Sequence, residues 1–466
     1  MPTSPSDLRG PSEEPYDLAV IGAGPAGLAA AVTAAAFGLR CVLLDAGPRP
    51  GGQYYRHPAP ALGATRPEKL HHGWAAFAAL RDRLAASTVH HLTEHQVWTA
   101  EAGTAERPWR LHALHGGEAV RVEATSVLLA TGAYERQLPF PGWTLPGVVT
   151  AGGAQAMLKA GLVLPGRRIV VAGSGPLLLA AASSLVSAGA TVPAVVEASN
   201  YLGYARGLTT LAANPAKLVE GAEHGTRLLR GKVRLRRSSA VVEAHGTDRV
   251  TAVTVARLDA GWRPVPGTER RIECDAVAIG HGLLPQIELA TELGARTVTT
   301  ADDTVALAVD DELRTSLPGL WAAGETCGVG GADLAIAEGA LAARVIAGAP
   351  VPASLRARRE RRRAFAGLMA AAHRPGPGWT DWLREDTDVC RCEEVPAGAI
   401  RAAVDELGAA DPRTVKLLTR AGMGWCQGRM CGPAVACLSG APELRPDSRP
   451  LACPVPLAQL ADGEPR

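Results

Sequence analysis

The sequence is poor in aromatic residues and has no long hydrophobic run. Aromatic side chains make up 4% of its 466 residues, whereas glycine occurs 52 times and alanine is abundant, which indicates helices packed onto sheets through small residues. No stretch reaches the roughly 18 apolar residues of a membrane-spanning helix, so no integral membrane segment is expected. The two longest apolar runs, residues 26–37 and 177–188, each follow a glycine-rich turn and are predicted to be crossover helices.

An excess of charge of one sign is also lacking. The formal net charge is +2, from 48 basic and 46 acidic side chains, so the overall balance offers no footprint for nucleic acid. Nine cysteines without a recognisable secretory signal indicate a reducing compartment. A cytoplasmic protein is therefore expected, with peripheral contact at the inner face of the membrane as an alternative. No Ser-His-Asp set or pair of carboxylates indicates an acid-base site, and the catalytic residues stay unassigned.

Residues 16–45 have the pattern of a dinucleotide-binding βαβ unit. A strand at 17–21, a glycine turn, a helix at 28–37 and a strand at 40–44 follow one another. Gly22 suits the tight turn, Gly24 the approach of a pyrophosphate, and Gly27 the close packing of helix on strand. The candidate binding residues of the turn are Gly22, Gly24, Pro25, Ala26 and Gly27.

The residues after this turn indicate which nucleotide it binds. Asp45 ends the second strand, where a carboxylate can accept the hydrogen bonds of an adenosine ribose and repels a 2′-phosphate. The segments at 51–53 and 324–325 favour FAD, because a long flavin cofactor needs a second contact at its ribityl chain. FAD is thus expected, with NAD or ATP as alternatives. The further candidate contacts are Gly52, Gln53, Thr131, Gly132, Gly324 and Glu325.

A second glycine turn, at residues 173–178, is degraded. A strand precedes it, a helix follows it, and Glu197 ends the next strand, where it could hold a ribose. Leu178 stands in place of the third glycine, so helix and strand cannot approach as closely. A structural remnant is favoured over a working NAD site.

Four cysteines near the C-terminus indicate one-electron chemistry. Cys390 and Cys392 form a Cys-x-Cys pair, and Cys426 and Cys431 a Cys-x4-Cys pair in a glycine-rich loop. Four thiolates on two loops suit a [2Fe-2S] cluster, in which each iron takes two protein ligands. Structural zinc is the alternative, although its pairs are usually spaced two to four residues apart. The lone Cys327 is expected to be an inert thiol that is buried or semi-buried.

These patterns predict an α/β fold with two Rossmann-like dinucleotide-binding domains, of the flavoprotein pyridine-nucleotide oxidoreductase type, and a small helical C-terminal [2Fe-2S] domain. Residues 1–15 are expected to be a disordered tail, and six arginines between 356 and 363 to form a solvated basic linker helix, with docking to an acidic partner as the alternative. The predicted domains are a discontinuous first domain at 16–150 and 271–350, a second at 151–270, the linker at 351–388 and the cysteine domain at 389–440.

Several motifs resemble one family of oxidoreductase subunits. They are GAGPAG at 22–27, GGQ at 51–53, ATGAYER at 130–136, GSGPLLL at 173–179, GGA at 330–332, AEG at 337–339, CRCEEV at 390–395 and CQGRMCG at 426–432. Together they are similar to opine oxidase A subunits and hydrogen cyanide synthase B subunits, and to the alpha subunits of proline dehydrogenase and sarcosine oxidase. The cysteine segment resembles the bacterioferritin-associated ferredoxin-like [2Fe-2S] domain. Glu325 departs from the family pattern, since flavoproteins of this fold commonly have Asp there.

The resemblance implies an electron-transferring subunit of a heteromeric amine or amino-acid dehydrogenase or oxidase, which would use substrates of the opine, glycine or proline type. A second flavoprotein subunit would carry the substrate site, FMN would lie at the subunit interface, and a downstream acceptor would take electrons from the cluster. One alternative is a self-contained NADH-dependent reductase that feeds a separate carrier. Another is a scaffold without redox function.

Overall fold

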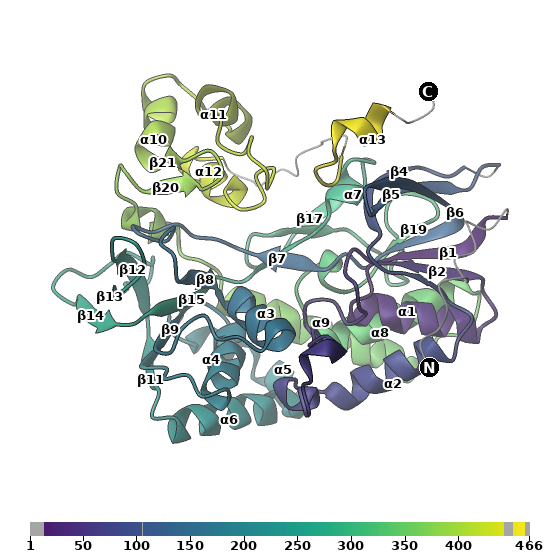
Figure 1. The fold of residues 1–466 in the computed structure, drawn as a ribbon, viewed down its shortest axis with the longest axis horizontal. Helices are drawn as coiled ribbons and strands as arrows, with labels where there is room; N and C mark the ends of the chain where they lie inside the picture. Colours follow the sequence, from purple (N-terminus) through teal and green to yellow (C-terminus); the bar gives the residue numbers. More distant parts are fainter. Residues whose placement is uncertain (1–13, 105, 442–450, 462–466) are drawn as a thin grey trace.

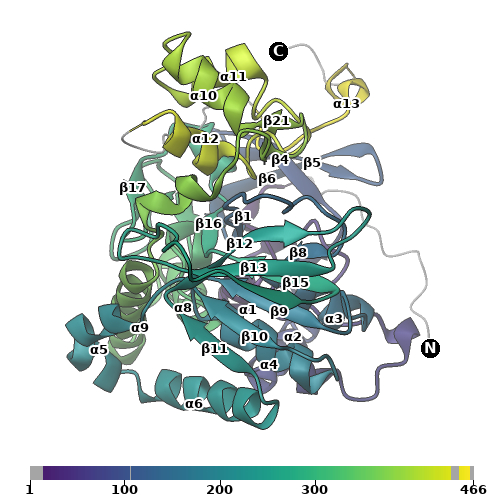
Figure 2. The same cartoon turned by 90° about the vertical axis from the view of Figure 1, so that its left-hand side faces the viewer.

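The structure is a computed structural model that describes residues 14–104, 106–441 and 451–461. Residues 1–13 of the tail predicted at 1–15 lie outside the described residues. Two nucleotide-binding domains lie side by side, and the cysteine-containing domain sits above them (Figures 1 and 2). Within the described residues, no helix is long and apolar enough to cross a membrane.

The first domain is built on a mixed sheet, seven of whose strands are described, in the order β3-β2-β1-β6-β5-β4 with β19 beside β6. The strands β3, β2, β1, β6 and β19 are parallel, whereas β5 and β4 continue the sheet in antiparallel pairing. The bounds are β1 Tyr16–Ile21, β2 Cys41–Leu44, β3 His90–Leu92, β4 Gln96–Glu101, β5 Trp109–His115, β6 Glu118–Leu129 and β19 Leu320–Ala322.

Helices α1 (Pro25–Ala36), α8 (Ala332–Ile346) and α2 (Trp74–Ala85) cover one face of this sheet (Figure 1). The predicted small-residue packing is seen where α1 meets α8, because a Cβ added to Gly339 would lie 2.0 Å from the carbonyl oxygen of Ala26. Any larger residue at 339 would therefore push the two helices apart.

The second domain has a parallel sheet of five described strands, in the order β11-β10-β9-β15-β8, beside a three-stranded antiparallel sheet, β12-β13-β14. The strand bounds are β8 Val148–Thr150, β9 Ile169–Gly173, β10 Ala194–Glu197, β11 Arg234–Arg237, β12 Ser239–His245, β13 Ala252–Arg257, β14 Arg270–Glu273 and β15 Ala276–Gly280. The helices of this domain are α3 Ala151–Gly161, α4 Leu177–Ser187, α5 Leu208–Ala212 and α6 Pro215–Arg230.

The predicted boundaries of the second domain are wrong at both ends. Residue 271 falls inside β14, and β15 pairs with β9 and β8, so these strands belong to the second domain. The chain passes between the domains through two short strands, β7 (Ala133–Glu135) and β16 (Leu283–Pro285), which pair with each other. Sheet pairing decides these boundaries, and the sequence does not show which strands pair. Two other short strands, β17 (Thr297–Thr299) and β18 (Val305–Leu307), form a hairpin.

The arginine-rich helix α9 (Ala353–Ala372) is wedged between the two domains, so the prediction of a solvated linker is wrong for one of its faces. A Cβ on Gly203 would lie 2.8 Å from the Cα of Ala372, and one on Gly207 would lie 2.6 Å from Leu368. Toward the first domain, Arg362 pairs with Asp333 at 3.1 Å. The sequence showed the arginines of α9 but not the carboxylates with which they pair.

The cysteine domain contains β20 (Asp388–Cys390), β21 (Val395–Pro396), α10 (Ala397–Asp405), α11 (Pro412–Thr419) and α12 (Gly432–Leu438). Helices α10 and α11 lie between the two cysteine loops, in agreement with the predicted helical domain. Its apolar core continues into the second domain, where Trp262 and Trp382 stack with ring centroids 6.1 Å apart. The short helices α7 (Glu288–Thr291) and α13 (Leu457–Ala461) lie toward the first sheet (Figure 1).

Candidate nucleotide site and cysteine cluster

The first glycine turn has the geometry that a bound pyrophosphate requires. Gly22 has φ +105°, and a Cβ there would lie 2.3 Å from the carbonyl oxygen of Ala130, while a Cβ on Gly27 would lie 1.8 Å from that of Gly22. A Cβ on Gly24, in contrast, would meet no described atom within 4 Å. Helix α1 begins at Pro25 without a side-chain cap, so its first-turn N–H groups stay available to an anion in the open space at Gly24.

Asp45 lies at the end of β2, next to this turn. Its Oδ2 accepts a hydrogen bond from the Ala23 N–H at 2.5 Å, and its Oδ1 accepts one from Gly47 at 2.6 Å. Each carboxylate oxygen retains a lone pair for a ribose hydroxyl. The Asp45 carboxylate thus holds the turn through two backbone N–H groups and can still accept a hydrogen bond from a ribose hydroxyl.

The segment 51–53 folds over the same turn. The Gly51 N–H donates to the Ala23 carbonyl at 2.7 Å, and a Cβ on Gly52 would lie 2.9 Å from the Cα of Gly24. The side chain of Gln53 is exposed, and its Oε1 accepts a hydrogen bond from Arg56 at 2.6 Å. Gly52 therefore lies against the glycine turn, while the cofactor contact of Gln53 stays a prediction.

Thr131 and Gly132 follow β6, the strand next to β1, and so lie at the same sheet edge as the glycine turn. The Thr131 hydroxyl donates to the Gln286 carbonyl at 2.6 Å, and the Gln286 N–H donates to the Gly132 carbonyl at 2.9 Å. These bonds tie the edge of the site to the chain that returns from the second domain.

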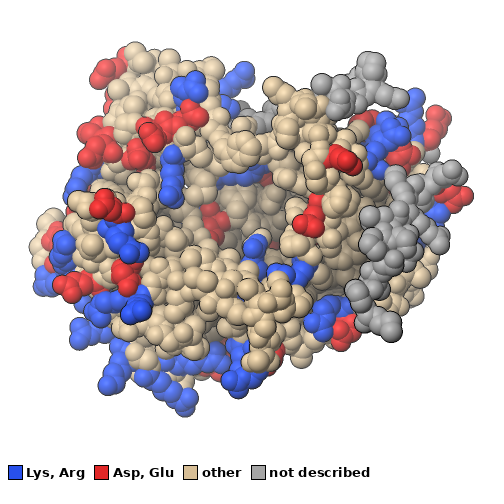
Figure 3. Space-filling model, viewed as in Figure 1, with Lys and Arg blue, Asp and Glu red and all other residues tan. Residues whose placement is uncertain are grey.

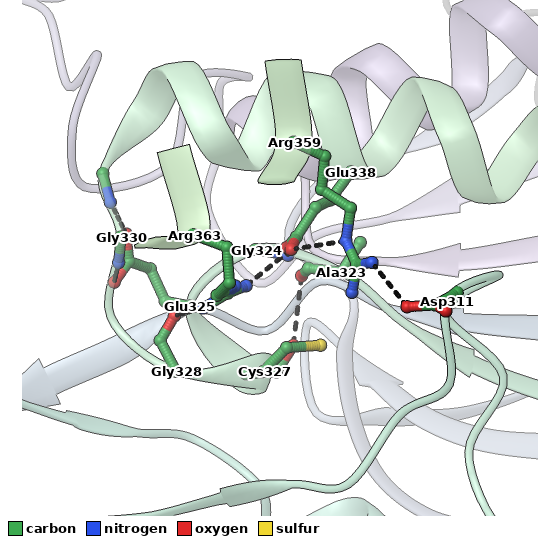
Figure 4. Close-up of polar contacts among 12 residues, drawn as sticks. Asp311, Ala323, Gly324, Glu325, Cys327, Gly328, Gly330, Glu338, Arg359 and Arg363 are labelled. Carbon is green, nitrogen blue, oxygen red and sulfur yellow. Dashed lines mark hydrogen bonds and ion pairs between the residues drawn. The ribbon is translucent and has the colours of Figure 1, made fainter. Parts of the chain in front are cut away.

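Gly324 and Glu325 are held by carboxylate–backbone hydrogen bonds (Figure 4). Glu325 accepts from the N–H groups of Gly330 at 3.2 Å and Gly331 at 2.8 Å, while burial raises its pKa against the lowering effect of those two bonds. The N–H of Gly324 donates to a different residue, Glu338 of α8, at 2.9 Å. Both oxygens of Glu325 thus shape the turn before α8, and Glu338 orients the backbone at Gly324.

Glu338 has no exposed surface and is paired with arginines of α9 (Figure 4). Its Oε1 accepts from Arg363 at 2.6 Å and lies 3.5 Å from Arg359. Arg363 also donates to the Gly328 carbonyl at 2.8 Å. Glu338 belongs to the AEG motif at 337–339, but the sequence assigned no role to it or to the two arginines. The available signal was an acid in the middle of the otherwise apolar stretch of α8.

The second site is enclosed by residues of this chain. Glu197 has no exposed surface and accepts from Gly175 N at 3.1 Å, Ser199 N at 3.0 Å and the Tyr201 hydroxyl at 3.3 Å. His373, at the end of α9, lies 3.6 Å from Glu197 and bonds the Tyr204 hydroxyl at 3.0 Å. The Glu197 carboxylate is therefore buried and already accepts three hydrogen bonds from its own chain.

The four cysteines lie together as two pairs, each of which joins the two loops. Cys390 interacts with Cys431, and this hydrogen bond lowers the pKa of Cys390 to about 5; Cys392 interacts with Cys426. A backbone N–H from Gly422 points at the Cys390 sulfur at 3.5 Å. In the described part of the chain no group of three or more metal-binding side chains surrounds a single point. Two thiol pairs are what a two-iron cluster needs, so this donor set fits.

Cys390 and Cys431 are buried, whereas Cys392 is exposed and Cys426 partly exposed. Gly424 allows the loops to meet, because a Cβ there would lie 2.3 Å from the Cβ of Cys392. The lone Cys327 is separate from this cluster, and burial raises its pKa to about 12, as an inert thiol requires.

Comparison with known proteins agrees with this geometry. The family described as pyridine nucleotide-disulphide oxidoreductase matches residues 16–339, and the BFD-like [2Fe-2S] binding domain matches residues 389–438. The second match includes all four cysteines of the cluster.

Two curated relatives match nearly the whole chain. The HcnB subunit of hydrogen cyanide synthase from Pseudomonas aeruginosa is 37% identical, and the match covers 88% of this chain and 90% of the relative. The A-type subunit of opine oxidase from Agrobacterium tumefaciens is 34% identical, with 90% and 84% covered. The sarcosine oxidase alpha chain of Rhizobium meliloti is 30% identical over 72% of this chain, which corresponds to 31% of that larger protein.

Solved structures share the fold at lower identity. L-proline dehydrogenase from P. horikoshii has a TM-score of 0.68 and 19% identity, with 96% of this chain and 79% of the other covered. Thioredoxin reductase from T. acidophilum has a TM-score of 0.53 and 21% identity, with 72% and 99% covered. The chain is therefore an oxidoreductase of the pyridine nucleotide-disulphide oxidoreductase family, with a C-terminal BFD-like [2Fe-2S] binding domain.

Proposed function

We propose that this chain is the electron-transferring FAD and [2Fe-2S] subunit of a heteromeric amine or amino-acid dehydrogenase. The observation that carries the proposal is that one open dinucleotide turn and a paired four-cysteine cluster occur in the same chain, while the second dinucleotide site is enclosed. The relatives that match most of the chain are named as subunits of a synthase and an oxidase, which supports a role as one part of a larger enzyme.

FAD would be held by the open turn at Gly24, the Asp45 carboxylate and the edge segments at 131–132 and 324–325. When bound, FAD supplies the conversion of two-electron to one-electron transfer. Glu338 and Glu325 keep the backbone of the 324–331 segment in place, and Gly52 closes the loop over the pyrophosphate position. NAD and ATP would use the same turn and ribose acid, so extraction of the bound nucleotide decides among them.

Cys390, Cys392, Cys426 and Cys431 would hold the cluster, one cross-loop pair to each iron. Gly422 directs an N–H at the Cys390 sulfur, and such hydrogen bonds favour the reduced, more negative state of a cluster. The exposed side of the cluster at Cys392 suits a downstream electron acceptor that docks from solvent.

The substrate site would lie on a second flavoprotein subunit. The face in Figure 3 is hollowed between the cysteine domain and the two nucleotide domains, which offers a docking place for that protein and for FMN at the interface. Amines of the opine, glycine or proline type are the substrates that we infer from the relatives. The alternative of a self-contained NADH reductase finds no support in the second domain, where Glu197 is fully enclosed.

The chain purified alone tests the proposal. It should contain iron and an adenine nucleotide, yet fail to oxidise opines, glycine or proline until its partner subunit is added. Vigorous oxidation of any of these by the isolated chain would overturn the two-subunit scheme. A reduced sample without a [2Fe-2S] signal in electron paramagnetic resonance would overturn the cluster.

A further inference from the structure

Arg429 stands between the two cysteines of the second ligand loop and contacts three parts of the molecule. Its Nη1 donates to the Cys426 carbonyl at 3.3 Å, within its own loop. Its Nε pairs with Glu288 of the first domain at 2.8 Å, and Nη2 donates to the Ala452 carbonyl of the C-terminal segment. With about a fifth of its side chain exposed, Arg429 joins the ligand loop to two other segments.

Glu288 connects this arginine to the edge of the first nucleotide site. It is the first residue of α7 and lies two positions after Gln286, which is hydrogen-bonded to Thr131 at 2.6 Å and to Gly132 at 2.9 Å. A continuous path therefore runs from Thr131-Gly132 through Gln286 and Glu288 to Arg429 and the carbonyl of Cys426. It links the expected nucleotide edge to the expected cluster through covalent bonds, hydrogen bonds and one ion pair.

Tyr134 lies close to the residues that connect the ligand loop to the first domain. Tyr134 follows Gly132 by two residues. Burial raises the pKa of its phenol, and the charges of Glu288 and Cys426 raise it further, whereas the charge of Arg429 lowers it. All three groups are thus close enough to affect one phenol. The side chains of Arg429 and Glu288 are 20% and 24% exposed, so water screens their charges only in part.

Charge at this position acts on the cluster in a definite direction. Reduction adds one negative charge to a [2Fe-2S] cluster, and its potential depends on nearby charge, hydrogen bonds to sulfur and exposure. A guanidinium beside the Cys426 carbonyl stabilises the reduced state of the cluster, whereas the carboxylate of Glu288 opposes that effect. The two charges should move the potential in opposite senses.

We propose that Arg429 is a positioning residue that fixes the ligand loop on the first nucleotide domain and raises the midpoint potential of the cluster. Glu288 holds Arg429 in place through their ion pair, and its negative charge lowers the potential in part. The inference rests on the proposed function, since it requires that the four cysteines hold a [2Fe-2S] cluster. It assigns no role in substrate oxidation to either residue.

The test is a redox titration of the full chain, followed by the paramagnetic signal of the reduced cluster. We expect Arg429→Gln to lower the midpoint potential and Glu288→Gln to raise it, each changing the reduced-to-oxidised ratio at a fixed ambient potential at least threefold, which is about 30 mV for one electron. Arg429→Lys keeps the charge and should shift the potential less than Arg429→Gln. Arg413→Gln, which removes an exposed charge from α11 of the same domain, is the matched control and should shift it least.

The two glutamine variants are expected to shift the midpoint potential in opposite directions, whereas loosening of the ligand loop would shift it in the same direction in both. Shifts of the two glutamine variants in the same direction, or shifts no larger than that of Arg413→Gln, would overturn it. If Arg429→Gln does not assemble a cluster, Glu288→Gln still decides the matter, because it replaces no residue of the ligand loop and must raise the potential. A wild-type chain without any reducible cluster would refute the proposed function itself, and this inference with it.

Discussion

Replacement of Glu338 by glutamine tests whether the buried carboxylate holds the first nucleotide domain together. Glu338 is fully buried, receives a hydrogen bond from Gly324 and pairs with Arg363 and Arg359, whose side chains are 28% and 14% exposed. Removal of one partner from a buried ion pair typically costs about 3–5 kcal/mol because a charge is left unpaired. Since both arginines reach some water here, we expect a smaller cost, about 2–3 kcal/mol.

For a domain of this size, 1 kcal/mol corresponds to about 2–4 °C in melting temperature, so the Glu338→Gln variant should melt about 4–12 °C lower. Differential scanning calorimetry at pH 7 measures this shift. The control is Glu360→Gln, which removes an exposed carboxylate from α9 and should change stability by less than about 0.5 kcal/mol.

The double variant Glu338→Gln with Arg363→Met removes the charge on both sides of the pair. It should recover part of the lost stability, because no guanidinium of residue 363 is then left buried without its partner. An unchanged melting temperature in Glu338→Gln, or a double variant that melts no higher than the single one, would refute the reasoning from the buried pair.

Three further outcomes are expected. Cys392→Ser and Cys431→Ser should each reduce the iron content and abolish the [2Fe-2S] signal, whereas Cys327→Ser should leave both unchanged; retention of the full signal in either ligand variant would contradict the assigned cluster. Anaerobic addition of NADH should leave the flavin absorbance unbleached, because Glu197 is enclosed; rapid bleaching would restore the reductase hypothesis. Lys159 is buried and donates to the Tyr54 carbonyl at 3.2 Å, and burial lowers its pKa to about 8. Since the folded state then binds its proton more weakly than the unfolded state, stability should rise with pH between about 8 and 10.5 by about 3 kcal/mol at most. Denaturant unfolding of Lys159→Met across this range should show a smaller rise, and an equal rise would contradict the assignment.

Short sequence patterns were enough to predict several features of the fold and of the candidate sites. The first βαβ unit was predicted because glycine positions, an apolar helix and a strand-ending acid are requirements of short segments, and all of these lie within about 30 residues. The BFD-like [2Fe-2S] domain was equally predictable, since Cys-x-Cys and Cys-x4-Cys pairs restrict the chemistry by themselves. The cofactor contact of Gln53 stays a prediction, because its side-chain direction depends on Arg56 and on the way the loop folds back over Gly24.

Contacts between distant segments could not be predicted in the same way. The enclosure of Glu197 depends on His373, which is far along the chain and arrives there only because α9 packs between the two domains. The domain boundary near 271 depends on the pairing of β15 with β9 and β8. Glu338 and Arg363 become partners only when α8 and α9 pack side by side.

The sequence by itself determined the motifs on which the proposed chemistry rests: a glycine turn followed by an acid at the end of the next strand, a degraded copy of that turn, and four cysteines in two loops. These depend on residue type and short spacing, which backbone geometry translates directly into local structure. Only the tertiary structure decided that the second site is enclosed, that the basic helix neutralises a buried carboxylate beside the first site, and that Arg429 joins the cysteine loop to the nucleotide edge. The physical reason is that burial and charge pairing arise between segments far apart in the chain, and no local pattern specifies which of them will meet.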